Sequence, residues 1–378
     1  MARYVIGFED LRRADVALVG GKNSSLGEMV QELAGQGIAV PGGFATTSDA
    51  YRAFLSANGL EAMIADTVGR WQAGKITLAE AGSAIRAAIV SGDWPEEIRT
   101  DILTSYAALS ETAGKADVAV AVRSSATAED LPDASFAGQQ ETFLNIEGEA
   151  DLLTACRRCF ASLFTDRAIS YREVKGFDHM AVALSVGVQR MVRADTGGSG
   201  VMFSIDTESG FDKIVLINAA WGLGENVVQG AVDPDEYQVF KPFLADESLS
   251  PIVGKRRGAK EIKMILGGNG PAPVRNVPTS KADRAAWVLS DAEILSLARM
   301  AATMRVGNEG NKAIAANYQA LFSDVSSAYK GLFAMVLDHM RSLDATARTK
   351  HAHVESLLEK AIEAKRAELQ TLDTPQQP

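Results

Sequence analysis

The chain has few of the features that mark secreted or membrane proteins. Only two of its 378 residues are cysteines, Cys156 and Cys159, which is too few for a framework of disulfides. No stretch approaches the roughly 18 consecutive apolar residues that a membrane-spanning helix requires. Acidic residues at Glu9 and Asp10 precede any long apolar run, so we expect no secretory signal peptide. These absences together predict a cytoplasmic protein without a membrane partner.

Basic residues are also in the minority. The chain holds 38 Lys and Arg against 48 Asp and Glu, a formal net charge of −10. Such a chain is not drawn to nucleic acid or anionic lipid, so a nucleotide would need a local basic site. With 47% hydrophobic and 23% charged residues the composition is that of an ordinary globular protein, neither disordered nor collagen-like. At roughly 150 residues per domain, the length allows two or three domains.

The first 180 residues or so mix helix and strand patterns. Apolar residues over 26–33 recur at helical spacing, Ser25 and Glu28 are placed as a capping box, and Gly35 fits the C-terminal cap. Three short strands and one further helix are expected, the strands over 4–8, 117–122 and 141–146 and the helix over 151–164.

The second zone, from about 181 to 300, is rich in strand patterns. Apolar residues alternate with small or polar ones over 182–189, which is typical of a strand. Two glycine-containing turns and two further strands follow, the turns at 195–200 and 208–210 and the strands at 201–205 and 214–218. This order predicts a series of antiparallel hairpins. Ser290 and Glu293 form another capping box, which opens a helix through Met300.

From about residue 303 the chain changes character. Strand signals become few, and Ala, Glu and Lys become frequent. Apolar residues form one helical stripe, made of Val354, Leu357, Leu358, Ile362 and Leu369. The pattern predicts a helical tail, either a helical hairpin or a surface through which the chain forms a homo-oligomer.

The first candidate for chemistry is the run Gly20-Gly21-Lys22. The glycines let the backbone approach a ligand, and the lysine lies just before a helix N-terminus, where free N–H groups favour an anion. The spacing is not that of a P-loop. Taken alone, the run is explained equally by a surface lysine after a glycine turn.

The second candidate is Arg123, at the end of an apolar run. An arginine held there can place its forked donors on phosphate oxygens. In the following loop, Gly138 would let N–H groups face a phosphate chain, and Thr142 could donate one more hydrogen bond. The alternative is a structural turn with a surface Arg–Glu pair. Two phosphate-type elements within 20 residues, with Lys22 upstream, favour the phosphate interpretation.

The third candidate, residues 188–192, joins the first two zones. In a two-lobed nucleotide enzyme such a connector can meet the adenine edge, although the alternation explains it equally well as an ordinary strand. Glu225 and Asp235 follow strands and could lie near a metal or a phosphate. Turns of the same composition are common.

Five motifs taken together resemble the nucleotide-binding domain of the phosphoenolpyruvate synthase (pyruvate, water dikinase) family, a domain shared with pyruvate phosphate dikinase and rifampin phosphotransferase. They lie at 20–26, 123–130, 135–143, 188–192 and 222–230. The resemblance covers residues 1 to about 302. It implies an α+β, ATP-grasp fold with ATP between two lobes, 1–185 and a strand-rich 186–302, followed by a divergent helical tail over 303–378.

The resemblance also implies roles for single residues. Lys22 and Arg123 would hold phosphates and act in catalysis. Gly138 and Thr142 would line the phosphate loop, and Gln189 would lie near the base or the lobe junction.

In the family, ATP phosphorylates a histidine on a mobile domain, and pyruvate then becomes phosphoenolpyruvate while AMP and phosphate leave. Its members continue after about residue 302 with Ile-Glu-Trp-Ala and Gln-x-Arg-Pro strands that bind Mg²⁺. Here residues 303–312 carry neither motif, and the histidine domain and the pyruvate barrel are missing. His351 only faintly echoes the family's histidine motif. We therefore expect this chain alone not to complete the reaction.

Two other interpretations stay open at this point. The chain could be a non-catalytic ATP-binding protein that pairs with a separate phosphohistidine-carrying chain. It could also be part of a rifampin-type phosphotransferase.

Two further patterns point away from function. Cys156 and Cys159 lie on the apolar stripe of an expected helix, so we expect packed thiols rather than a zinc site. The basic residues at 255–257, with Lys260 and Lys263, are expected to form a solvated loop.

Overall fold

The structure is a computed structural model. It describes several parts of the chain, with gaps between them. The described residues are 3–35, 37–127, 130–131, 134–135, 141–246, 248–267, 273–306, 318–320 and 332–334. Gly138, His351 and His353 and the expected helical stripe over 354–369 lie outside them.

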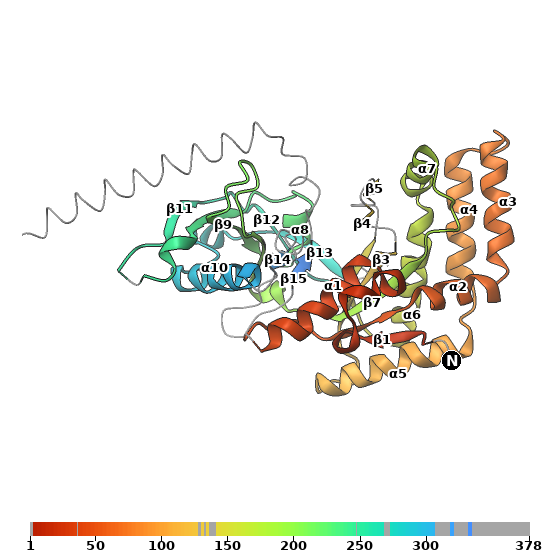
Figure 1. The fold of residues 1–378 in the computed structure, drawn as a ribbon, viewed down its shortest axis with the longest axis horizontal. Helices are drawn as coiled ribbons and strands as arrows, with labels where there is room; N and C mark the ends of the chain where they lie inside the picture. Colours follow the sequence, from red (N-terminus) through yellow and green to blue (C-terminus); the bar gives the residue numbers. More distant parts are fainter. Residues whose placement is uncertain are drawn as a thin grey trace, which may run out of the picture.

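The N-terminal half is built around a five-stranded antiparallel sheet (Figure 1). Its strands, in spatial order, are β1 (Val5–Gly7), β2 (Gly43–Thr46), β7 (Leu184–Arg190), β3 (Val120–Ala126) and β6 (Thr142–Ile146). Its helices are α1 (Val16–Ala34), α2 (Ser48–Ala57), α3 (Leu60–Gln72), α4 (Leu78–Ser91), α5 (Glu96–Thr112), α6 (Glu149–Ala161) and α7 (Asp166–Lys175). Short elements complete it: η1 (Phe8–Asp10), η2 (Arg13–Asp15), η3 (Ser162–Phe164), β4 (Asp130–Leu131) and β5 (Ala134–Ser135).

The two central strands of this sheet have one apolar and one polar face. Val122 on β3 and Val188 on β7 point into a core that α2 to α7 complete. Because side chains alternate along a strand, Arg123 and Gln189 belong to the opposite face. The sheet therefore separates the core of this half from a face that carries polar groups.

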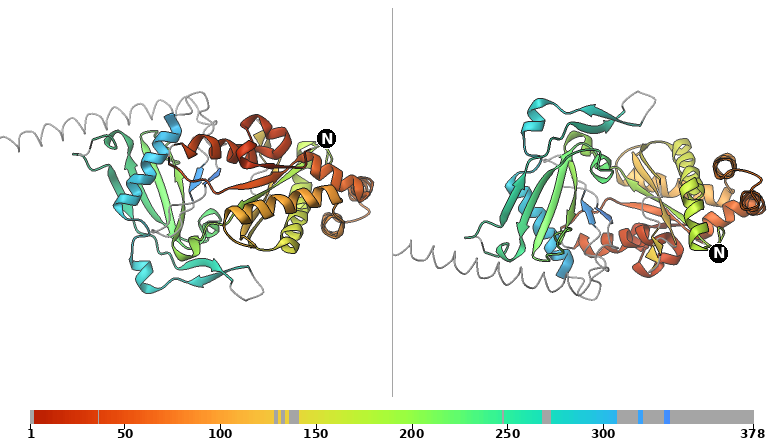
Figure 2. Two further views of the ribbon diagram at one scale, coloured as in Figure 1. Left: turned by 90° about the horizontal axis from the view of Figure 1, so that it is seen from below. Right: turned by 90° about the horizontal axis from the view of Figure 1, so that it is seen from above.

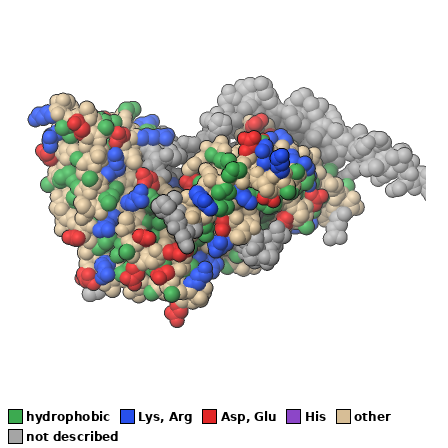
Figure 3. Space-filling model, turned by 180° about the vertical axis from the view of Figure 1, so that it is seen from behind, with side chains coloured by type: hydrophobic (Ala, Val, Ile, Leu, Met, Phe, Trp, Pro, Cys, Tyr) green, Lys and Arg blue, Asp and Glu red, His purple; other side chains and the backbone are tan. Residues whose placement is uncertain are grey.

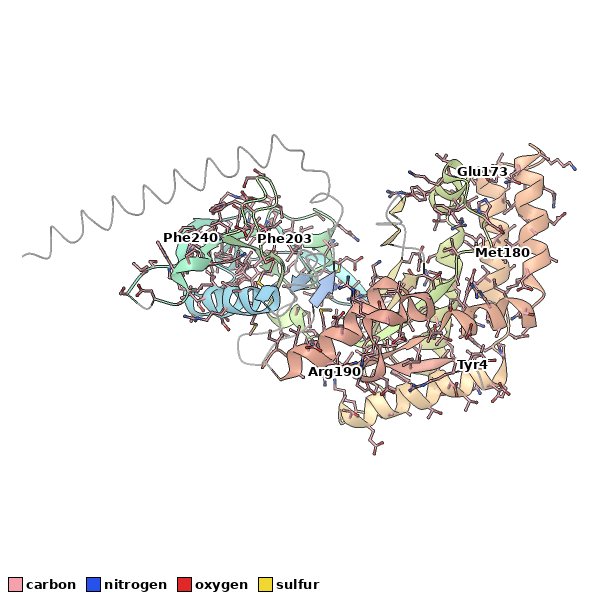
Figure 4. All side chains as sticks on the ribbon, in the orientation of Figure 1. Tyr4, Glu173, Met180, Arg190, Phe203 and Phe240 are labelled. Carbon is pink, nitrogen blue, oxygen red and sulfur yellow. The ribbon has the colours of Figure 1, made fainter. Side chains whose placement is uncertain are left out.

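The second half is built on a four-stranded antiparallel sheet. Its strands, in spatial order, are β11 (Ile252–Arg256), β10 (Asp235–Phe240), β9 (Ile214–Trp221) and β8 (Gly198–Phe203). Other elements are η4 (Ala194–Thr196), α8 (Glu225–Val228), η5 (Lys241–Phe243), β12 (Ile262–Leu266), β13 (Val274–Pro278), α9 (Lys281–Ala285) and α10 (Asp291–Val306). Arg190, the last residue of β7, lies on the side of the first half that faces the second half. Phe203, the last residue of β8, lies in the second half (Figure 4).

Helix α1 belongs to both halves. Its apolar residues Leu26, Met29 and Leu33 share one buried cluster with Ile217 of β9 and Ile294 of α10. Figure 2 shows α1, in red, lying along the first sheet and reaching the blue α10. Burial of these side chains ties the position of α1 to both sheets.

Most strands expected from the sequence are present at their places, including those over 4–8, 141–146, 201–205 and 214–218. The capping box before α10 is also confirmed. Ser290 N donates to Glu293 Oε2 at 2.7 Å, and Glu293 N donates to Ser290 Oγ at 3.4 Å.

The expected start of the first helix is wrong. Helix α1 begins at Val16 and crosses a kink at Gly20, whose φ is 75° and ψ is 166°. Gly20 breaks the helical path for one residue, and the helix resumes at once, so Ser25 lies inside it rather than at its N-cap.

The described part of the tail consists of the end of α10, up to Val306, and two short strands. β14 (Tyr318–Ala320) and β15 (Leu332–Ala334) pair antiparallel. Within the described residues, no helix has the length and apolar character needed to cross a membrane.

Candidate functional site

The candidate site lies on the polar face of the first sheet. Arg123 on β3 is registered directly with Gly187 on β7 and with Thr142 on β6. Residues registered across antiparallel strands project to the same face. Gly187, Arg123 and Thr142 therefore form one row across β7, β3 and β6, with Arg123 in the middle.

The glycine–lysine turn is packed onto this same face. A Cβ placed on Gly20 would lie 2.3 Å from Ser125 Oγ, so the backbone of the kink touches β3 two residues from Arg123. Asn23 N donates to Ser125 Oγ at 3.4 Å, and Asn23 Nδ2 donates to Ser185 Oγ at 2.8 Å. Lys22, which is half-buried, lies in the sequence between the two anchored residues, Gly20 and Asn23.

The absence of a side chain at Gly187 leaves room for this anchoring. A Cβ there would lie 2.3 Å from Asn23 Oδ1. Asn23 and Ser185 were not among the residues that sequence reasoning singled out for the site. The signal that marks Ser185 is its polar side chain in the small and polar half of the 182–189 alternation.

Arg123 is half-buried and has the Gln189 amide as a hydrogen-bond partner. Its Nη1 donates to Gln189 Oε1 at 3.3 Å. Burial lowers the pKa of Arg123, and the carboxylate of Glu225 acts in the opposite direction. An arginine remains protonated at neutral pH under such a shift. The structure thus holds a permanent positive charge on the polar face, beside the Gly20–Lys22 turn.

Glu225 comes to Arg123 from the second half of the chain. It opens α8, and Gln229 Nε2 donates to Glu225 Oε1 at 2.8 Å. Burial raises the pKa of Glu225, whereas the Arg123 guanidinium lowers it. Glu225, which could lie near a metal or a phosphate or in an ordinary turn by its sequence alone, is within electrostatic reach of Arg123 in the structure.

Asp235 has a different place from the one considered for it. Its Oδ1 accepts from Gly258 N at 2.9 Å, and its Oδ2 accepts from Val288 N at 2.9 Å and from Tyr237 Oη at 3.1 Å. It also forms an ion pair with Lys260, and both side chains are fully buried. Asp235 therefore holds the second half together, and its oxygens are occupied by protein donors.

The basic residues are only partly solvated, and they do not form the loop that was expected, since Lys255 and Arg256 lie on β11 and Lys263 lies on β12. Lys255 and Arg256 are exposed and form ion pairs, with Asp291 at 2.7 Å and Asp233 at 3.1 Å respectively. Lys260 is instead buried. Basic and acidic side chains are interspersed on the face of the molecule shown in Figure 3.

The expectation of packed thiols is confirmed. Cys156 and Cys159 are free, buried members of the first core. Burial raises the pKa of Cys156 to about 12 and that of Cys159 well above its ordinary value.

The described ranges contain no group of three His, Cys, Asp or Glu side chains arranged to hold a metal ion. We therefore assign no magnesium ligands to them.

The chain is similar to known proteins over most of its length. The family described as pyruvate phosphate dikinase, AMP/ATP-binding domain, matches residues 16–306. The chain is 54% identical over 302 residues to a phosphoenolpyruvate synthase of Synechocystis sp., covering 79% of this chain and 37% of that protein. It is 53% identical over 304 residues to a phosphoenolpyruvate synthase of Neisseria meningitidis, covering 80% of this chain and 38% of that protein.

A phosphoenolpyruvate synthase of Escherichia coli is 49% identical over 302 residues, covering 79% of this chain and 38% of that protein. The chain thus spans less than two fifths of the length of these relatives, at 37% to 38%. The match takes in the Gly20–Lys22 turn, Arg123, Thr142, Gln189 and Glu225. This chain belongs to the family of the AMP/ATP-binding domain of pyruvate phosphate dikinase.

Proposed function

We propose that this chain binds ATP on the polar face of the first sheet, as a nucleotide-binding domain of the phosphoenolpyruvate synthase type. The observation that carries the proposal is the seating of the Gly20–Lys22 turn on β3 two residues from Arg123. The helix resumes directly after Gly20, so Lys22 lies in the first turn of the resumed helix, where N–H groups and the helix dipole favour an anion. Arg123 adds a fork of donors suited to phosphate oxygens.

The proposed fold detail is an ATP-grasp arrangement, with one lobe over 1–185, a second over 186–302 and a divergent tail over 303–378. The boundary expected at 185/186 falls within β7, whose residues up to Arg190 belong to the sheet of the first half. Lys22, Arg123, Thr142 and, in the loop before β6, Gly138 would surround the phosphates. Support comes from the registration of Thr142 with Arg123 and from the position of Glu225, which reaches Arg123 from the other half.

The proposed reaction of the complete system converts ATP, pyruvate and water to phosphoenolpyruvate, AMP and phosphate through a phosphohistidine. The names of the relatives support this branch over rifampin-type transfer. Lys22 and Arg123 would stabilise the charge that builds on the transferred phosphoryl group. When bound, Mg²⁺ would neutralise phosphate charge. The proposed protein is a phosphotransferase, and its proposed location is the cytoplasm.

A second candidate is an ATP-binding protein without chemistry of its own, acting with a separate chain that carries the phosphohistidine. One sequence observation favours it. Residues 303–312 carry neither of the magnesium-binding motifs that the family resemblance leads us to expect there.

Titration calorimetry of the whole chain with ATP, with and without Mg²⁺, tests binding directly. A rise in melting temperature with ATP accompanies binding, because a ligand of the native state stabilises it. Chromatography of the nucleotides after incubation with ATP, Mg²⁺ and either pyruvate or rifampicin then tests chemistry. AMP formed only with pyruvate supports the synthase reaction, and AMP formed only with rifampicin supports the rifampin branch. Binding without AMP shows that this chain binds ATP but needs a separate chain that carries the phosphohistidine, as in the second candidate. No heat and no stabilisation with ATP would reject the proposal.

A further inference from the structure

We propose that Gln189 is the positioning residue of Arg123. The Gln189 amide bridges the guanidinium to the carbonyl of Pro41 and so fixes the direction in which Arg123 presents its donors. The inference rests on the ATP site proposed above, and it assigns the Gln189 side chain to Arg123 rather than to the nucleotide base.

Both ends of the Gln189 amide are engaged. Its Oε1 accepts from Arg123 Nη1 at 3.3 Å, and its Nε2 donates to Pro41 O at 3.0 Å. The residue is 3% exposed. An arginine can only donate and a carbonyl can only accept, so these two partners fix which end of the amide is oxygen. An amide side chain satisfies both partners at once.

The register of the sheet brings these groups together. Gln189 is paired with Ala121 on β3 and with Gly43 on β2, whereas Arg123 is paired with Gly187. Arg123 and Gln189 are thus diagonal neighbours on one face, a separation that long side chains can span. The residues paired with Gln189 and Arg123, Ala121 and Gly187, are small and leave this face open to the two long side chains. At Gly43 a Cβ would lie 2.2 Å from Val188 O, so a larger residue does not fit there.

A neutral partner suits an arginine that has to bind phosphate. An unsupported guanidinium loses conformational freedom when it binds, and holding it in its bound orientation beforehand removes that cost. A carboxylate at position 189 would hold Arg123 more strongly but would oppose the phosphate charge. It would also face the Pro41 carbonyl, and a carboxylate has no hydrogen to donate to that oxygen. The amide orients Arg123 without adding a second carboxylate to that of Glu225.

The test compares ligands that differ in phosphate content. Titration calorimetry with ATP and ADP, and competition against ATP for adenosine, is carried out on the wild type, Gln189→Leu, Gln189→Glu and the control Gln238→Leu. Gln238 is an exposed strand glutamine whose Nε2 donates to Glu236, so its replacement leaves the site intact. Loss of a hydrogen bond to a charged group predicts an ATP affinity about tenfold weaker in Gln189→Leu. Adenosine affinity is expected to stay at the wild-type value.

Gln189→Glu should bind ATP more weakly still, again with unchanged adenosine affinity, and it keeps an acceptor for Arg123 should Gln189→Leu lose its cooperative unfolding transition. In an Arg123→Ala background, Gln189→Leu should cause no further loss. An equal loss for adenosine and ATP would show that Gln189 contacts the base and would overturn the inference, as would ATP binding unchanged in both variants. Failure of the wild type to bind ATP would instead reject the proposed function.

Discussion

Gly20 and Ser125 are in direct contact, although 105 positions separate them in the sequence. A Cβ on Gly20 would lie 2.3 Å from Ser125 Oγ and 2.7 Å from the carbonyl carbon of Ser125. Gly20 also has a φ of 75°, a conformation that other residues rarely adopt. The position thus requires glycine twice, once for its backbone angle and once for the space that β3 occupies.

Gly20→Ala is therefore expected to lower the free energy of unfolding by more than the backbone penalty alone would. Left-handed backbone and overpacking together predict a loss of about 2 kcal/mol or more in the free energy of unfolding. Gly37→Ala is the matched control, because Gly37 has the same φ of 75° and nothing within 4 Å of an added Cβ. That variant should lose only about 1 kcal/mol. Urea unfolding measures both, and equal losses would show that the contact with Ser125 costs nothing.

Arg123→Ala should weaken ATP binding by about 1.5–3 kcal/mol, because a charge-assisted hydrogen-bond donor is lost. Arg193→Ala serves as a comparison, since Arg193 is an exposed arginine that forms an ion pair with Asp195 at 2.8 Å. Its removal should leave ATP affinity unchanged. Calorimetric titration distinguishes the two variants. If Arg123→Ala binds ATP as tightly as the wild type, Arg123 does not contact the phosphates.

Local patterns predict much of this molecule. The alternation over 182–189 predicts β7, including which of its residues face the core. The motifs point to Lys22, Arg123, Thr142 and Gln189, which the structure brings to one sheet. What the patterns could not provide is pairing between distant residues. The bond between Arg123 and Gln189 depends on how β3 and β7 are registered, and no local spacing contains that information.

Lys260 is a second residue whose surroundings the local sequence does not predict. Among Lys255, Arg256 and Lys263 it has the appearance of one more solvated cation. Its partner Asp235 is 25 positions earlier, and only the sheet brings the two together. A buried charge is tolerated when a partner and hydrogen bonds compensate it, and both conditions arise from tertiary structure.

Removal of one member of this buried pair should be strongly destabilising. Lys260→Met leaves the Asp235 carboxylate buried without its counter-charge, which predicts a loss of about 3–5 kcal/mol in the free energy of unfolding. Arg256→Met removes an exposed pair, whose side chains are 54% and 50% exposed, and should lose less than about 1 kcal/mol. Denaturant unfolding compares them. Losses of similar size would show that the Lys260–Asp235 pair contributes no more than a surface ion pair.

The two thiols provide a probe of global unfolding. Cys156 and Cys159 are the only cysteines in the sequence, and both are buried with raised pKa values. Because the thiolate is the reactive form, neither should react with a thiol reagent at pH 8 in the folded protein. Both should react in guanidinium chloride. Rapid modification of either one in native buffer would contradict the packing of α6 against the first core.

His179 should make stability depend on pH near neutrality. It follows α7, which ends at Lys175 and carries Glu173, labelled in Figure 4. His179 Nδ1 accepts from Arg172 Nε at 3.1 Å, so its Nε2 carries the proton toward Glu173 Oε2 at 3.3 Å. Burial lowers the pKa of His179, with the Arg172 charge acting in the same direction and Glu173 and Asp178 opposing it. Protonation would set two cations against each other.

Because the folded-state pKa of His179 lies below the ordinary value near 6.5, the unfolded chain binds the proton more readily. The stabilisation is complete above pH 6.5 and is lost as the pH falls below that value. The free energy of unfolding should therefore decrease between pH 7.5 and pH 5.5, a window above the range in which Glu173, with its lowered pKa, titrates. His179→Gln keeps an acceptor for Arg172 without titrating, so its stability should change less across the same window. His351→Gln controls for histidine loss elsewhere, and a pH dependence removed by that variant rather than by His179→Gln would show that His179 is not the titrating group.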